Sequence, residues 1–443
     1  MSVAERGELK PGELAPGELA PGEIEIERSQ LERLRRLLAE VAAGNAFYRP
    51  RLEAAGLLGG VESLGDFRSR MPFTTKAELI ADQLRHPPYG SNLSYEPHRY
   101  VRLHQTSGTS GQPLRWLDTA ESWQVMVGHW QRVFAAAGIG PGERVFFPFS
   151  FGPFLGFWTA FEAASASGAL AIPGGGLSTK ARLRVLLDNR ATAVCCTPTY
   201  ALRLAEAAAE EGVVLAAEGA VRKVVVAGEP GGGIAGVRAR IAEAWGGAEV
   251  FDHHGMTEVG PVSYPNRRFP GVLHVIESGY LAEIVEQGGD RPAPPGEVGE
   301  LVLTTLGRAG SPLLRYRTGD LVRRSARTAE ELGSADLALE GGILARCDDM
   351  VVVRGVNLYP SAIDEVLRRF PEIGEYRVEL RTDRAMTEIR IELEPWPNQP
   401  AEGLAQRVEE ALRSSFQLRV PVELADPGSL PRFELKAKRW VRI

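Results

Sequence analysis

Apolar side chains are spaced in two ways along the chain, and each spacing predicts a type of element. In residues 28–43 they recur every three or four positions, which predicts an amphipathic helix with Leu34, Leu38 and Val41 on its buried face. The same spacing predicts further helices at 177–190, 200–212 and 236–247. Short apolar runs separate them and are typical of strands that are buried on both faces of a sheet. These runs lie at 143–150, 192–199, 221–230 and 248–255.

This alternation of strands and helices predicts a layered α/β fold with a mostly parallel sheet. From residue 271 to 317 the texture changes, and alternating apolar and polar residues predict a β-rich subdomain. A smaller α+β unit, of ordinary size for a mobile domain, follows from about residue 346. We therefore expect a large N-terminal domain over residues 26–345 and a small C-terminal lid domain over residues 346–443.

The first 25 residues differ from the rest of the chain. They repeat a pentamer, GELKP, GELAP, GELAP and then GEIEI, in which Pro and Gly recur too often for a helix. Few of these side chains can pack in a core. We predict a low-complexity acidic tail over residues 1–25, which serves as a linker and not as a docking arm.

Composition and charge exclude several classes of protein. The 443 residues carry a net charge of −6, so nothing indicates a surface for nucleic acid. Three cysteines, two of them adjacent, do not form a disulfide framework and favour a reducing, cytoplasmic location. The start lacks the basic-then-apolar pattern of a signal peptide. The apolar run at 145–161 contains Pro and Gly, so we interpret it as core or pocket wall and expect no membrane partner.

Several turns carry side chains that could do chemistry. Residues 106–113 read TSGTSGQP, a composition that suits either a phosphate-binding loop or a plain turn, and they lack the ending of a P-loop. The turns AGEP, at 227–230, and DHHGMTE, at 252–258, each follow a strand-like run. Ligands bind at the carboxyl ends of parallel strands, so these turns could line one crevice. A carboxylate at Glu258 suits Mg²⁺, whereas adjacent histidines in a strand point to opposite faces and do not suit one zinc ion.

Six segments, taken in order, identify a family. TSGTSGQP, AGEP, HHGMTE, LLRYRTGDLV, ARCDDMVVVRGVNLYP and LPRFELKAKR together resemble the adenylate-forming superfamily. The segments FYRPRLEAAG, MPFTTKAEL and CCTPTYALRLAE resemble its phenylacetate–CoA ligase family. The resemblance covers residues 31–443, nearly everything outside the repeats. It implies a large α/β domain joined to a small mobile domain.

The resemblance implies an ATP site built from these motifs. The loop at 106–111 would hold the β- and γ-phosphates, the turn at 228–230 would pack on adenine, and Asp320 would bind the ribose with support from Arg346. The residues implied in ATP binding are Thr106, Ser107, Gly108, Thr109, Ser110, Gly111, Gly228, Glu229, Pro230, Asp252, His253, Asp320 and Arg346.

The resemblance also implies the residues that carry the reaction. Lys436, Thr257 and Glu258 are implied as catalytic, with Thr257 beside the α-phosphate and Glu258 as the ligand of Mg²⁺. The carboxylate of the substrate would attack ATP, release pyrophosphate and form an acyl-adenylate. The small domain would then rotate about Asp348, and the thiol of coenzyme A would enter past Gly355.

Some positions depart from the family pattern. His254 stands where Tyr is usual, Gln112 where Lys is frequent, and Ala345 where Gly precedes the arginine. Many family members hold a structural zinc ion through cysteines near the equivalents of 263–268 and 323–336. Both stretches lack Cys here, so we expect no structural zinc.

The run FPFSFGPFLGF, at 147–157, is rich in Phe and uncharged, so it suits a flat aromatic or apolar acid. We predict an acyl pocket lined by Phe149, Phe151, Phe154 and His254. The same rings could equally be ordinary core.

Three alternatives remain open at this point. The acyl group could pass to the thiol of a carrier protein, or the enzyme could adenylate nitrite and diazotise an aryl amine. The chain could also bind nucleotide without catalysis. A homodimer is an expectation at the level of the family.

Overall fold

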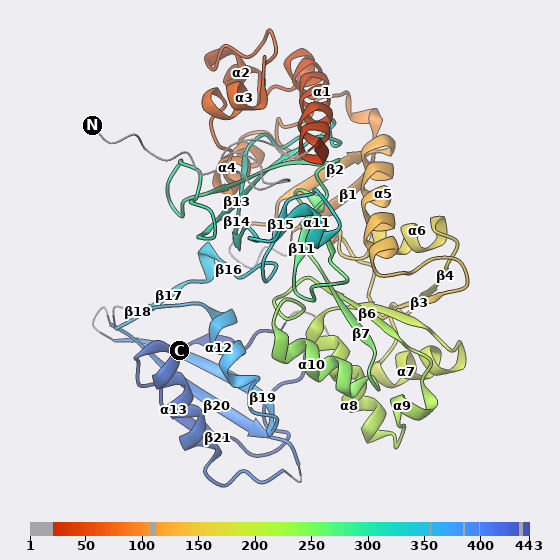
Figure 1. The fold of residues 1–443 in the computed structure, drawn as a ribbon, viewed down its shortest axis with the longest axis vertical. Coiled ribbons are helices and arrows are strands. Elements are labelled where there is room, and N and C mark those ends of the chain that lie inside the picture. The colour runs from red at the N-terminus through yellow and green to blue at the C-terminus, as the bar shows by residue number, and fades with distance from the viewer. Residues whose placement is uncertain (1–20, 107–111, 355, 384–385, 398, 434–436) are drawn as a thin grey trace, which may run out of the picture.

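The computed structural model describes residues 21–106, 112–354, 356–383, 386–397, 399–433 and 437–443 (Figure 1). A large region and a small C-terminal lobe lie side by side, with the lobe next to α8 (Pro198–Glu210) and α10 (Ala235–Ala244). Within the described residues, no helix is long and apolar enough to cross a membrane.

The described chain begins with a helix that is longer than predicted. Helix α1 (Pro21–Gly44) starts within the stretch that the sequence assigns to the tail, and it buries the expected Leu34, Leu38 and Val41. Proline is tolerated in the first turn because its missing N–H has no partner there. The prediction of a tail up to residue 25 was therefore too long, and residues 1–20 lie outside the described residues. Three short helices follow, α2 (Arg49–Ala54), α3 (Leu64–Arg70) and α4 (Lys76–Arg85).

The central sheet has five parallel strands, which confirms the predicted fold class. Its strands in spatial order are β4 (Leu170–Pro173), β3 (Arg144–Phe147), β5 (Ala193–Cys196), β6 (Lys223–Ala227) and β7 (Glu249–His253). Successive residues of β3 enter different cores, since Val145 packs with α5 (Ala120–Ala136) and α6 (Trp158–Ala166), and Phe146 with α7 (Thr179–Asp188) and α8. Burial on both faces explains why these strands read as unbroken apolar runs.

A β-rich part shares a core with this sheet, and it includes the region where the texture changes after residue 271, as predicted. Its largest sheet is antiparallel and consists of β12 (Tyr280–Val285), β13 (Val298–Thr305), β14 (Tyr316–Arg323) and β16 (Ala345–Arg346). A second sheet consists of β10 (Ser263–Pro265), β11 (Leu273–Val275) and β15 (Ala338–Leu339). Smaller elements are β1 (Tyr100–Gln105), β2 (Arg115–Thr119), β8 (Gly255–Met256), β9 (Gly260–Pro261), α9 (Leu215–Glu218), α11 (Ala329–Leu332) and the 3₁₀ turns Pro97–Arg99 and Cys347–Asp349.

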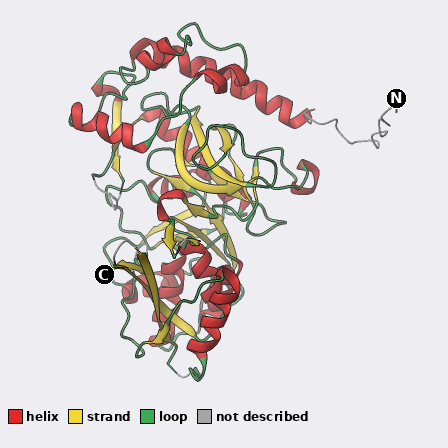
Figure 2. Ribbon diagram, turned by 90° about the vertical axis from the view of Figure 1, so that its left-hand side faces the viewer, coloured by secondary structure: helices red, strands yellow, loops and turns green. Residues whose placement is uncertain are grey.

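The small lobe has its own sheet and its own core. Strands β21 (Val422–Leu424), β20 (Met386–Pro395), β19 (Ile373–Asp383) and β22 (Trp440–Arg442) form the sheet in that order. Helices α12 (Pro360–Leu367) and α13 (Leu404–Phe416) pack on it, and the hairpin β17 (Val351–Val353) and β18 (Val356–Leu358) precedes them. Figure 2 shows the N-terminal helices at the top of the molecule and the C-terminus in the lower half.

Candidate active site

The predicted ATP motifs lie on loops that follow strands. Thr106 directly follows β1, and there its buried hydroxyl accepts the N–H of Leu114 at 3.0 Å while its own N–H donates to the Leu114 carbonyl at 2.9 Å. These bonds close a turn between β1 and β2 around the predicted phosphate loop. Residues 107–111 of that loop lie outside the described residues, as do Gly355 and Lys436. Gly228, which follows β6, has a φ of 96°, a conformation that favours glycine at the start of the predicted adenine turn.

Asp320 is the centre of a polar cluster. Its side chain is buried in β14, where Oδ1 accepts the Nη1–H of Arg346 at 2.8 Å and Oδ2 lies 2.9 Å from Nε2 of His254. Burial acts to raise the pKa of Asp320, but the charges and hydrogen bonds of His254 and Arg346 outweigh it and hold the pKa below its ordinary value. Arg346 also donates to Asp348, the predicted hinge residue, at 2.8 Å. The expected contact between Arg346 and Asp320 is thus present, and their ligand remains a prediction.

The two adjacent histidines face opposite sides, as expected of neighbours in an extended chain. His253, predicted beside the adenine, is buried against Trp130 with ring centroids 4.1 Å apart, and its Nδ1 donates to the Ser263 carbonyl at 2.7 Å. Burial lowers the pKa of His253 to about 3, so the ring is neutral at pH 7. His254 contacts Asp320, and its predicted place in the acyl pocket stays a prediction. Side chains alternate along an extended chain, so only one of the two can face each side.

Asp252 lies where glycines make room for it. A side chain at Gly232 would bring its Cβ to 2.1 Å from Oδ1 of Asp252, so this approach requires glycine. Burial raises the pKa of Asp252 to about 6, against the opposing charges of His254 and Arg238. A cavity of about 340 Å³ between α10 and β11 is bordered by Asp252, Arg238 and Leu273.

Glu258 has a cationic partner that the sequence analysis did not identify. Its carboxylate is buried, and Oε1 lies 3.0 Å from Nζ of Lys76 and accepts from the Tyr316 hydroxyl at 3.5 Å. Lys76 is the first residue of α4, which Thr75 caps by accepting the N–H of Glu78. Lys76 lies within the segment MPFTTKAEL, which resembles the family, but this resemblance does not indicate a role for the lysine.

A buried arginine holds the turn that carries Thr257 and Glu258. Nη1 of Arg308 donates to the carbonyl oxygens of Thr257 at 3.1 Å and Glu258 at 2.9 Å. Its Nε and Nη2 donate to the two carboxylate oxygens of Asp118 at 2.9 and 2.7 Å. Both charged side chains are almost inaccessible to solvent. Nothing in the sequence near Arg308 or Asp118 indicates this pairing, because they are far apart in the chain.

The predicted acyl pocket is in part an aromatic cluster. Phe149 and Phe151 meet edge to face at 5.3 Å, and Phe149 also contacts the buried Phe157 at 5.5 Å. Phe154 does not belong to this cluster, because its side chain is 37% exposed. Its role as a pocket residue stays a prediction. Trp130 continues the cluster from Phe157 to His253.

The donor set suits a magnesium ion that is bound mainly by phosphate. Over the part of the chain that the structure describes, no group of three or more His, Cys, Asp or Glu side chains could hold a metal. Glu258 supplies one buried carboxylate, and Mg²⁺ commonly takes one or two carboxylates plus substrate phosphates. Glu258 therefore fits an ion that arrives with a nucleotide.

Comparison with known proteins places these features in a family. The family model described as AMP-binding enzyme matches residues 68–308, more than half of the chain, and the model of the AMP-binding enzyme C-terminal domain matches residues 355–442. The phenylacetate-coenzyme A ligase of Thermus thermophilus is 32% identical over 428 residues, which cover 91% of this chain and 93% of that protein.

Solved structures give the same result and also report on conformation. A 2-hydroxyisobutyryl-CoA ligase in the postadenylation state has a TM-score of 0.85 at 28% identity, covering 98% of this chain and 95% of that one. The same ligase in the thioesterification state, at 28% identity and the same coverage, has a TM-score of only 0.68. The lobes here are thus arranged more nearly as in the postadenylation state. By its sequence over nearly the whole length and by its fold, the chain belongs to the phenylacetate–coenzyme A ligase family of adenylate-forming, AMP-binding enzymes.

Proposed function

We propose that this enzyme activates a small carboxylic acid with ATP and transfers the acyl group to coenzyme A. The observation that carries the proposal is the cluster around Asp320, in which Arg346 and His254, directly after β7, hold a buried carboxylate. A carboxylate held in this way retains lone pairs for the hydroxyls of a ribose. Family membership supports the same reaction.

The reaction has two steps that share one site. In the first, an oxygen of the acid bonds to the α-phosphorus of ATP while the bond to pyrophosphate breaks, which yields acyl-AMP. In the second, the sulfur of coenzyme A bonds to the acyl carbon and AMP leaves. The first step needs positive charge near the phosphates. We assign this to Lys436, which lies outside the described residues, and to a Mg²⁺ ion that Glu258 would hold on the turn that Arg308 keeps in place.

Glu258 would hold Mg²⁺ through its carboxylate, and this ion would neutralise phosphate charge when bound. Lys76 contacts the same carboxylate at 3.0 Å, so it adds a positive charge on the same side of the turn.

We propose an aromatic acid as the substrate. Phe149, Phe151 and Phe157 offer ring surfaces without charge, and Trp130 extends them toward His253. Such surfaces favour a flat apolar group through burial and edge-to-face contacts. The name of the Thermus thermophilus relative, a phenylacetate-coenzyme A ligase, agrees with this choice.

The test is pyrophosphate release by the purified full-length protein over a panel of aromatic acids with ATP, Mg²⁺ and coenzyme A. We expect AMP, pyrophosphate and an acyl-CoA in equal amounts for at least one aromatic acid. No product with any acid would refute the proposal. Parallel reactions with a carrier-protein thiol, and with nitrite plus an aryl amine, distinguish the other acceptors.

A further inference from the structure

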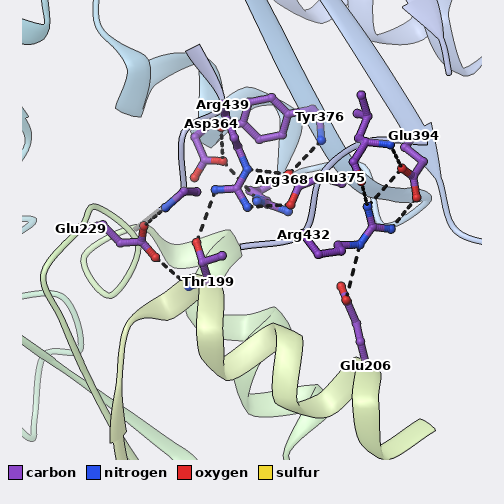
Figure 3. A network of polar contacts seen from close by, with 12 residues as sticks. Thr199, Glu206, Glu229, Asp364, Arg368, Glu375, Tyr376, Glu394, Arg432 and Arg439 are labelled. Carbon is purple, nitrogen blue, oxygen red and sulfur yellow. Dashed lines mark hydrogen bonds and ion pairs between the residues drawn. The ribbon is translucent and has the colours of Figure 1, made fainter. Parts of the chain in front are cut away.

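Polar contacts join the two lobes on both sides of residues 434–436 (Figure 3). From the large region, α8 and the turn after β6 contribute Thr199, Glu206 and Glu229. From the small lobe, the C-terminal stretch contributes Arg432, Ala437 and Arg439. The residues from the small lobe lie just before and just after Lys436 in the chain, the lysine that the family resemblance implies as catalytic.

Glu229 connects the lobes with a single carboxylate. Its Oε1 accepts the N–H of Thr199, in the first turn of α8, at 2.8 Å. Its Oε2 accepts the N–H of Ala437 at 2.9 Å. Ala437 is covalently bonded to Lys436, so this second bond fixes the backbone next to that lysine. Hydrogen bonds to a charged acceptor are stronger than neutral ones, and both of these depend on the carboxylate.

Arg439 supports the same junction two residues later. Its guanidinium is bound within the small lobe by both carboxylate oxygens of Glu375, at 2.5 and 3.1 Å. Its Nη1 reaches across to the Thr199 hydroxyl at 3.5 Å. Arg439 is 13% exposed, and it directly precedes β22, where its carbonyl accepts the N–H of Val378 in β19 of the small-lobe sheet at 2.7 Å. The contact with Thr199 therefore ties that sheet to α8.

Arg432 makes the corresponding contact before the lysine. Within the small lobe its Nη1 donates to Oε2 of Glu394 at 3.1 Å, and the Glu394 side chain is buried. Its Nε lies 3.6 Å from Oε2 of Glu206 on α8. Burial raises the pKa of Glu206, which Arg432 opposes. An ion pair thus crosses the interface before the lysine in the chain, and the hydrogen bond from Ala437 to Glu229 crosses it after the lysine.

We infer that Glu229 is a positioning residue for adenylation, and that with the Glu206–Arg432 pair it latches the small lobe in the orientation that forms acyl-AMP. The latch opens before coenzyme A reacts. The inference rests on the proposed function. It is supported by the lobe arrangement, which is nearer to a postadenylation structure than to a thioesterification structure of the same relative.

The decisive variant is Glu229→Gln, which keeps the size of the side chain. An amide has one acceptor oxygen and would turn its NH₂ toward the second backbone N–H, so one arm of the bridge is lost. We expect kcat for ATP–pyrophosphate exchange to fall at least 10-fold with little change in KM for ATP. Thioester formation from supplied acyl-adenylate and coenzyme A should be unchanged or faster.

Glu218→Gln is the matched control. Glu218 also accepts a backbone N–H, that of Val214, at 2.8 Å, but both residues belong to the large region. This variant should leave both half-reactions unchanged. Glu206→Gln removes the negative charge that pairs with Arg432, at a position outside the adenine turn. This variant should lower the rate of ATP–pyrophosphate exchange a few-fold without affecting thioester formation.

Three results would overturn the latch. The first is an equal loss of rate in both half-reactions of Glu229→Gln. The second is a change in KM for ATP alone, which would indicate that Glu229 only contacts adenine. The third is that Glu229→Gln has the rates of the wild type. If the wild-type protein gives no exchange with any acid, the proposed function fails but the latch is still tested by small-angle X-ray scattering of the nucleotide-free protein. The latch predicts a larger radius of gyration for Glu229→Gln than for the wild type and Glu218→Gln, and identical curves would exclude it.

Discussion

The buried pair between Asp118 and Arg308 offers the sharpest test of how the site is held. Asp118 accepts two hydrogen bonds from Arg308 and a third from the Ser122 hydroxyl at 3.0 Å. Asp118→Asn keeps the shape but removes the negative charge. The guanidinium then remains buried without a counter-charge, and the carbonyls of Thr257 and Glu258 depend on an arginine that is no longer fixed.

The magnitude follows from the burial of the pair. The two side chains are 1% and 3% exposed, so solvent cannot replace the lost charge. Breaking such a pair from one side costs about 3–5 kcal/mol, which is a large part of the ~5–15 kcal/mol that stabilises an ordinary domain. An exposed pair provides the control, because Arg291 is 78% exposed where it meets Glu286. Glu286→Gln should cost less than ~1 kcal/mol.

Urea unfolding followed by tryptophan fluorescence measures both variants. Trp116 reports on the region directly, since the guanidinium carbon of Arg308 lies 5.7 Å from the centre of its ring. We expect Asp118→Asn to lower the unfolding midpoint strongly and to slow pyrophosphate release, and Glu286→Gln to do neither. A free energy of unfolding for Asp118→Asn within ~1 kcal/mol of the wild type would refute the reasoning.

Three further substitutions test the electrostatics of the site. Asp252 has a pKa raised from 3.8 to about 6 by burial, so the fold disfavours its charged form, and Asp252→Asn should raise the free energy of unfolding at pH 7.5 by up to ~3 kcal/mol. That gain should shrink as the pH falls from 6 to 4, and a gain independent of pH in thermal melts would contradict it. Lys76→Met removes the ammonium group that competes for Oε1 of Glu258, so half-maximal pyrophosphate release should need less Mg²⁺; an unchanged requirement would show that the two cations do not compete. His254→Ala removes a hydrogen bond to the charged Asp320 that is worth ~1.5–3 kcal/mol, so KM for ATP should rise about 10- to 100-fold while KM for the acid stays the same. A rise in KM for the acid with KM for ATP unchanged would indicate that His254 contacts the acid.

The sequence alone determined the fold class, because the periodicity of apolar residues follows directly from burial. Unbroken apolar runs such as 224–227 indicated strands covered on both faces, and residues 224–227 lie in β6, an inner strand of the sheet. The contact between Asp320 and Arg346 was also expected from the order of motifs. The sequence predicts a start of α1 that is too late, because Pro21 and Gly22 disfavour the interior of a helix. The first turn of a helix accommodates both residues, and α1 begins there.

Tertiary structure decided which side each residue faces and what it meets. The sequence indicated that His253 and His254 point in opposite directions, but only the packing of Trp130 and the position of Asp320 determined which faces which. Phe154 is exposed although its apolar neighbours pack together. Local patterns carry no information on such choices, because they depend on residues distant in the chain.

The partners at the site illustrate this limit most clearly. Lys76 reaches Glu258 across 182 positions, and Arg308 reaches Asp118 across 190. A motif specifies residues that lie close together in the chain, so the order of motifs could identify the family and its chemistry. The charges that hold those motifs in place come from segments that meet only when the chain folds, so no local pattern in the sequence indicates them.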